Sequence, residues 1–410
     1  MIVRRALLQG HRLTEREQKN LDLLELIRQQ GPITRTELSK GSGFNIVTVS
    51  NYVKDFIGQG LVVERGFDVS TGGRKPGLVE LNRQAGYAVG IDLGPMDYSP
   101  IVMKGVIADL HGTAVHHLVK PRPAESMEKV LACAQEMVRE LIATSSIDAR
   151  KIRGICIGVP GIVDEHAGTV RHTARGGVRT SYGELRNRCE TEFKVPVFVG
   201  SDAGLAGYGE YRLGLDQPVE NMVYMYSDIG ACLVVHGHVY WGAGGSAGEL
   251  GVHIPSEDDY LTWIQAPSFV TTNDWDLHLA AQAKRLVEEG HGSSIRQLVQ
   301  DQPEAIGLDT VIQAAQGGDH LAQELIEHAG MKLGIRIASI VNLMNPEVVV
   351  IGGGIERAGS LLLEPVWRAV KRYAYEEPAS LVDVLPAKLG EHAVAMGAAC
   401  WVIREIFIQA

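Results

Sequence analysis

The chain contains 410 residues, of which 45% are hydrophobic, and it carries a formal net charge of −10 at pH 7. This length is enough for two or three domains, each with a buried core. No segment approaches the roughly 18–20 consecutive apolar residues of a transmembrane helix, and residues 1–10 turn polar too early for a secretory signal peptide. Membrane-spanning and secreted classes are therefore excluded, and we expect a cytoplasmic protein.

The cysteines are dispersed and lack the close spacing of a disulfide framework or a zinc site. They are Cys133, Cys156, Cys189, Cys232 and Cys400. An odd, scattered set of this kind predicts reduced thiols in a folded core.

The charge is distributed unevenly along the chain. Residues 1–85 hold 13 Lys and Arg against 9 Asp and Glu, a net of +4, while the remainder holds 26 against 40, a net of −14. A basic module on an acidic body favours DNA binding at one end, because phosphate contacts need local positive charge.

Two capping boxes predict the first helices. Thr14 with Glu17 begins one helix, which Gly31-Pro32 ends, and Thr34 with Glu37 begins the next. The second helix breaks at residues 41–43.

A third helix is expected to begin after Asn45, a favourable N-cap residue. Val49, Val53 and Phe56 recur at i, i+4 and i+7, so they predict a buried face. Strands at residues 61–65 and 78–81, joined by a basic Gly-rich tip, complete the pattern of a winged helix-turn-helix.

The opposite face of this helix and the tip supply the predicted DNA contacts. Apolar side chains at the start of the helix suit thymine methyl groups, polar ones suit base edges, and Arg74 suits a narrow minor groove. The predicted set is Arg35, Ile46, Val47, Ser50, Asn51, Lys54, Arg74 and Lys75. The alternatives are that Ile46 and Val47 pack on a neighbouring domain and that Arg74 lies in a solvent-facing loop.

Beyond the wing the pattern changes to alternating strands and helices. Apolar strands are expected at residues 88–94, 105–109 and 152–159, with a helix over 126–144 between the last two. This alternation predicts an α/β architecture.

Several motifs in order resemble those of the ROK family of repressors and sugar kinases, in its winged-helix regulator branch. They are residues 70–76, 90–94, 158–164, 201–203, 242–251, 345–354 and 395–399. The resemblance implies a two-lobed, actin-like (ribonuclease H-like) sugar-kinase fold behind the DNA-binding domain. We expect a DNA-binding domain at 1–82, a first lobe at 83–200 completed by 375–410, and a second lobe at 201–374.

The phosphate loops depart from the family pattern. Where kinases carry Asp-x-Gly-Gly-Thr, Asp92-Leu93-Gly94 is followed by Pro95, Met96 and Asp97, and Asp228 interrupts the second loop. Each Asp places an anion where ATP phosphate would bind, although the Gly-rich turn at 352–354 is retained. The sequence therefore predicts an inactive kinase domain with no cofactor.

The positions that bind sugar in the ROK kinases follow the family pattern better than the phosphate loops do. Asp202 matches the position of the catalytic base in the kinases, and Glu249 matches a residue that binds sugar hydroxyls. His253 stands one residue after the expected histidine, and His172 and Arg175 lie in the segment that contacts sugar; exposed side chains without a ligand are the alternative for these three. Residues 255–272 contain no cysteine, so the family's zinc site is predicted to be absent.

These features together predict a transcriptional regulator, most simply a repressor of carbohydrate-metabolism genes that senses a sugar-like effector. A homodimer would present two recognition helices to an inverted-repeat operator. One alternative is a divergent sugar kinase with a DNA-binding domain. Another is a regulator controlled by a protein partner, without a small ligand.

Overall fold

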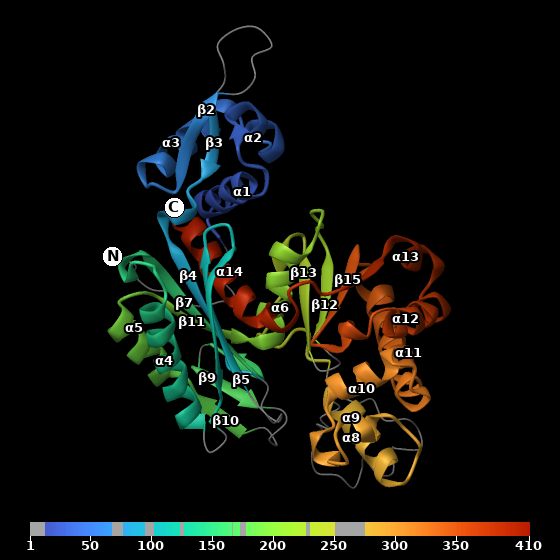
Figure 1. Ribbon diagram of the computed structural model, residues 1–410. Coiled ribbons are helices and arrows are strands. Elements are labelled where there is room, and N and C mark those ends of the chain that lie inside the picture. The colour runs from blue at the N-terminus through green and yellow to red at the C-terminus, as the bar shows by residue number, and fades with distance from the viewer. Residues whose placement is uncertain are drawn as a thin grey trace.

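The computed structural model describes residues 13–67, 77–94, 102–123, 127–165, 167–172, 178–226, 230–250 and 275–410. A small N-terminal domain stands above two larger lobes, each built on its own sheet (Figure 1). Among the described residues, no helix combines the length and apolar character needed to cross a membrane. The α/β architecture behind an N-terminal helical domain is confirmed.

The N-terminal domain packs three helices against a three-stranded sheet of order β1-β3-β2. Its elements are α1 (Glu15–Gln30), β1 (Ile33–Thr34), α2 (Arg35–Ser42), α3 (Ile46–Gly58), β2 (Val62–Phe67) and β3 (Gly77–Leu81). All three predicted N-caps are confirmed: Thr14 and Thr34 form complete capping boxes, and Asn45 accepts a hydrogen bond from the Thr48 N–H.

The first lobe is a five-stranded sheet of order β11-β7-β4-β5-β6 with helices on both faces. Its strands are β4 (Tyr87–Asp92), β5 (Val102–Asp109), β6 (Ala114–Pro121), β7 (Ile152–Val159) and β11 (Val197–Ser201). Helices α4 (Met127–Thr144) and α5 (Gly183–Phe193) cover one face, and α14 (Ala393–Ile408) covers the other. A smaller sheet follows β7 and contains β8 (Ile162–Asp164), β9 (Thr169–His172) and β10 (Val178–Ser181).

The second lobe is a five-stranded sheet of order β14-β13-β12-β15-β16 with a helical layer. Its strands are β12 (Met222–Tyr226), β13 (Gly230–Val235), β14 (His238–Val239), β15 (Val348–Gly352) and β16 (Asp383–Pro386). The helices are α8 (Trp275–Glu288), α9 (Ile295–Leu298), α10 (Leu308–Gln316), α11 (His320–Met344), α12 (Ser360–Tyr373) and α13 (Glu376–Leu381).

The C-terminal segment divides between the lobes, whereas residues 375–410 as a whole were expected to complete the first. Strand β16 pairs in parallel with β15 of the second sheet. Val382 and Val384 are buried in the core of that lobe, which fixes the strand there. Only α14 returns to the first sheet, so the expectation was wrong for β16.

A pair of helices joins the two lobes. Helix α6 (Asp202–Gly209) contacts strands of both sheets and lies against α14. The backbones approach so closely that a Cβ added at Gly397 would lie 1.7 Å from the Leu205 carbonyl oxygen. Glycine is therefore the one residue that fits this crossing without moving a backbone.

Candidate functional site

The predicted recognition helix α3 has one buried and one exposed face. Val49, Val53 and Phe56 are fully buried in the N-terminal domain. Ile46 and Val47 are 45% and 67% exposed, so neither is buried against the described parts of a neighbouring domain. An apolar pair open to solvent at the start of a helix remains available for a partner molecule.

The other predicted DNA contacts on α2 and α3 differ in whether their side chains already have a partner within the chain. Asn51 and Lys54 are exposed. The Ser50 hydroxyl donates to the Ile46 carbonyl oxygen at 2.7 Å, which leaves its lone pairs as acceptors. Arg35 forms an ion pair with Glu64 of β2 at 2.8 Å.

Strands β2 and β3 pair antiparallel and form the predicted wing. Val62 faces Leu81 in the register, and the pairing shifts between Glu64 and Phe67. The predicted contacts Arg74 and Lys75 at the tip lie outside the described residues. Their roles stay predictions.

In the body of the protein, three carboxylates from separate elements form an acidic cluster. Asp92 ends β4, Asp202 begins α6, and Glu249 forms an isolated bridge with Gly230 at the start of β13. The charges of Asp92 and Glu249 both act on Asp202. Of this cluster, Asp202 and Glu249 were predicted as effector-binding residues, and Asp92 was predicted only as part of a phosphate loop.

Burial shifts the pKa values of these three carboxyls upward, most strongly that of Asp202. Burial raises the pKa of Asp202 to about 8, and repulsion from Asp92 and Glu249 adds to that rise. Burial also raises the pKa of Asp92 to about 6, against a hydrogen bond from the Gly94 N–H at 2.7 Å.

Glu249 is exposed, yet nearby protein partly desolvates its carboxyl group. Burial raises the pKa of Glu249 to about 7, and the charge of Arg171 opposes the rise. Partly protonated carboxyls can both donate and accept hydrogen bonds, as a polyhydroxyl ligand requires.

Trp241 explains why the residue two positions after Asp202 is glycine. Ser201 caps α6 by accepting from the Gly204 N–H at 3.3 Å. A Cβ at Gly204 would lie 2.7 Å from the Ser201 hydroxyl and 3.0 Å from the Trp241 ring. The indole thus takes the space of a longer side chain beside Asp202.

The structure describes little of the remaining predicted sugar contacts. His172 ends β9, and its side chain lies outside the described part of the structure, as do Arg175 and His253. Arg171, the neighbour of His172, was missed although its charge acts on Glu249. The one feature of the sequence that could have indicated Arg171 was its position as a cation next to the predicted contact His172.

The Gly-rich turn after β15 is already occupied by a carboxylate of the chain. Gly353 and Gly354 have positive φ angles of 87° and 104°. The Gly354 N–H donates to the carboxylate of Glu356 at 2.7 Å, and Glu356 is buried. Burial raises the pKa of Glu356, while hydrogen bonds from its own and the Gly354 backbone N–H oppose the rise. The Gly354 N–H is therefore not free to bind a phosphate oxygen.

The buried Arg122 side chain fixes the backbone at the start of the first phosphate loop. Arg122 donates to the carbonyl oxygens of Leu93 and Gly94 at 3.1 and 2.8 Å. The continuation of this loop, with Asp97, and the second loop, with Asp228, lie outside the described residues. So does the segment 255–272, where zinc was predicted to be absent.

Comparison with known proteins agrees with this arrangement along almost the whole chain. The xylose repressor of Caldicellulosiruptor bescii is 29% identical over 400 residues, which cover 97% of this chain and 98% of the relative. The DNA-binding transcriptional dual regulator NagC of Escherichia coli is 26% identical over 385 residues, covering 93% and 91%.

Solved structures support the same fold. A ROK family transcriptional regulator described as a homologue of the E. coli MLC protein superposes with a TM-score of 0.75 at 22% identity, covering 96% of each chain. A ROK family glucokinase from Streptomyces griseus, with a TM-score of 0.63 at 22% identity, covers 77% of this chain and 98% of its own. The ROK family model matches residues 88–405. This chain belongs to the ROK family.

Proposed function

We propose that this protein is a transcriptional repressor of carbohydrate-metabolism genes that responds to a sugar. The observation that carries the proposal is a winged helix-turn-helix with an open α3 face, joined to a ROK body. Relatives aligned over nearly their whole length are named xylose repressor and N-acetylglucosamine repressor. A homodimer would place two α3 helices on an inverted repeat.

In this proposal α3 lies in the major groove. Ile46 and Val47 contact thymine methyl groups, Asn51 reads a base edge, and Lys54 binds phosphate. The exposure of these side chains supports the assignment. Arg35 would reach a phosphate from its ion pair with Glu64.

Selection of fragmented genomic DNA with the full-length protein is expected to enrich one inverted repeat. Asn51→Ala is expected to weaken binding to that DNA about 5- to 150-fold, because a bidentate contact of Asn with adenine contributes roughly 1–3 kcal/mol. Electrophoretic mobility shift or fluorescence anisotropy gives the affinities.

Gln30→Ala is the matched control, since it removes an exposed amide from the end of α1. The control should bind as the parent does. A parent that enriches no DNA at any salt concentration contradicts the regulator proposal.

The acidic cluster is the proposed effector site. Asp92, Asp202 and Glu249 offer carboxyls from both lobes to sugar hydroxyls, and Arg171 adds a donor nearby. D-xylose and N-acetylglucosamine are the first probes, because relatives are named for them. The further contacts proposed are His172, Arg175 and His253.

Asp202→Asn is expected to weaken binding of the active sugar about 5- to 150-fold, because a buried sugar hydroxyl left without its matching partner costs roughly 1–3 kcal/mol. Titration calorimetry on the full chain gives the affinity. Asp301→Asn, at an exposed carboxylate that pairs with Arg296, should have no effect.

If the parent and Asp202→Asn bind the sugar with equal affinity, the acidic cluster is not the effector site. If no sugar raises the melting temperature of the parent, control by a protein partner becomes the better proposal.

The kinase activity of the fold is proposed to be lost. Glu356 occupies an N–H of the Gly-rich turn, and Asp97 and Asp228 add anions to the two phosphate loops. A coupled ADP-release assay with ATP, Mg²⁺ and a panel of pentoses and hexoses should give no sugar-dependent rate. A rate on the order of 1 s⁻¹, the lower end for kinases, would favour the divergent sugar kinase instead.

A further inference from the structure

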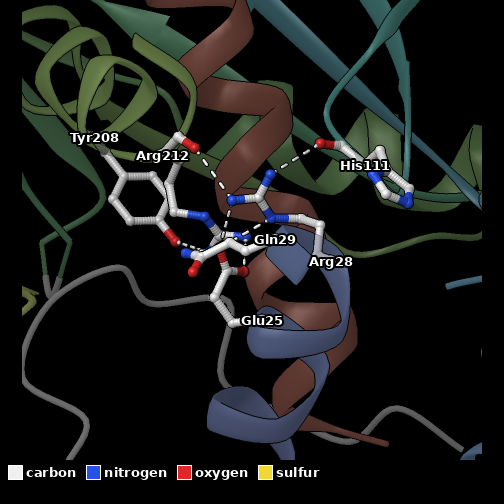
Figure 2. A network of polar contacts seen from close by, with 6 residues as sticks. All are labelled: Glu25, Arg28, Gln29, His111, Tyr208 and Arg212. Atoms are coloured by element: carbon white, nitrogen blue, oxygen red, sulfur yellow. Dashed lines mark hydrogen bonds and ion pairs between the residues drawn. The ribbon is translucent and has the colours of Figure 1, made fainter. Parts of the chain in front are cut away.

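A buried polar network joins the DNA-binding domain to the body. Figure 2 shows Glu25 and Arg28 of α1 directed at Arg212 and Tyr208, with His111 on the far side. The Arg212 guanidinium pairs with the Glu25 carboxylate and donates to the Tyr208 hydroxyl at 2.8 Å. Arg28 donates to Glu25 at 2.5 Å and to the carbonyl oxygens of Arg212 and His111 at 3.2 and 3.3 Å.

The network is strongly shielded from water. The side chains of Arg212 and Glu25 are 7% and 18% exposed. Burial alone would raise the pKa of Glu25, but the charges of Arg212 and Arg28, together with hydrogen bonds from Arg28 and Gln29, outweigh burial and lower it. The carboxylate therefore stays ionised at neutral pH. A buried pair of this kind tolerates little change in geometry, because separating the charges leaves each uncompensated.

Arg212 belongs to the same continuous helical segment as Asp202. Helix α6 starts at Asp202 in the acidic cluster and continues without a break into the π-helical turn η4 (Glu210–Gly214). Single π-helical turns within helices occur frequently at functional sites. One end of this segment thus lies in the proposed effector site and the other lies against α1.

The same segment is attached to both lobes. Helix α6 contacts β11 and β7 of the first sheet and β12 and β13 of the second. The buried Glu210 accepts hydrogen bonds from the Leu389 and Lys388 N–H groups at 2.6 and 3.2 Å, just after β16. A change in the angle between the lobes must therefore move this segment or break these contacts.

Helix α1 is also attached to the body at α14, where buried apolar side chains of the two helices belong to one hydrophobic cluster. The Asn20 amide donates to the carbonyl oxygens of Ile408 and Ala410 at the end of α14. Beside these contacts a cavity of about 890 Å³ lies between α1, β14 and α14; Asp22, Tyr211 and Trp241 are among its lining residues. Glu25 and Arg212 also line this cavity, so a change in the ion pair alters the space between α1 and the body.

We propose that the Glu25–Arg212 ion pair is the contact through which a ligand at the Asp202 end of α6 changes the operator affinity of the winged helix. The inference rests on the proposed function and specifies its regulation. In the unliganded protein the pair holds α1 and the attached α3 in the DNA-competent orientation. A ligand that changes lobe closure displaces η4 and weakens that hold.

The test compares Glu25→Gln with Glu15→Gln in the full-length protein. Glu15 lies on the same helix and its side chain is 83% exposed, so both variants lose one charge from α1 but only one loses the buried pair. The double variant Glu25→Gln/Arg212→Gln removes the pair without leaving Arg212 uncompensated. It guards against a single variant that fails to fold, and melting temperatures are recorded for all.

Operator affinity without sugar is measured first, on the DNA that the parent enriches. Glu25→Gln and the double variant are expected to bind it about 5- to 10-fold more weakly than Glu15→Gln. With saturating D-xylose or N-acetylglucosamine, whichever the parent binds, the parent and Glu15→Gln should lose affinity by a factor within the usual allosteric range of about 5- to 150-fold. The operator affinity of the pair variants should change less than about 3-fold with sugar. Without DNA these variants should bind sugar at least as tightly as the parent, because the ligand no longer has to disrupt the pair.

Pair variants that match Glu15→Gln in operator affinity and in sugar response would overturn the proposal. A parent that binds no DNA, or binds DNA but ignores every sugar, contradicts the proposed function instead. The two failures are therefore distinguishable.

Discussion

The near-contact of the α6 and α14 backbones at Leu205 and Gly397 is the constraint on which the rest of the arrangement depends. These two helices lie between the sheets of the two lobes, and each continues to the DNA-binding domain. The C-terminal end of α14 accepts a hydrogen bond from Asn20 of α1. Arg212 of η4, which extends α6, pairs with Glu25 of α1. Because glycine allows the backbones to touch, neither helix can slide freely past the other. We therefore expect a displacement at the proposed effector end to be passed on rather than absorbed.

The same fold occurs in a structure described as a glucokinase and in one described as a transcriptional regulator. We propose that local charge distinguishes this chain from a kinase. A kinase needs free N–H groups and cations at the ATP phosphates. Here the Gly354 N–H binds Glu356, and the pKa values of the Asp92, Asp202 and Glu249 carboxyls are raised by burial. Such a site suits hydroxyl groups better than phosphates.

Local features of the fold could be predicted from the sequence because their causes are local. The capping residues Thr14, Thr34 and Asn45 each act within three residues, and the buried face of α3 follows from helical periodicity. The placement of β16 could not be predicted, since a short apolar strand carries no mark of the sheet it joins. Its parallel pairing with β15 is set by the core of the second lobe.

The candidate site was predictable only where it coincides with family motifs. Asp202 and Glu249 were found in this way, but Arg171 was not, because its effect on Glu249 depends on how β9 is placed in space. The Glu25–Arg212 pair could not be predicted for the same reason, because its partners come from different domains. In the sequence each of them resembles an ordinary charged helix residue. Burial, which the sequence does not display, distinguishes them.

Amide hydrogen exchange of the full-length protein, bound to its operator with and without the active sugar, tests most directly whether the effector site communicates with the DNA-binding domain. We predict that sugar slows exchange around Asp202 and speeds it in η4 and in the C-terminal half of α1, where the ion pair is released. Changes confined to the two lobes, with α1 and η4 unaffected while the operator is released, would contradict this mechanism.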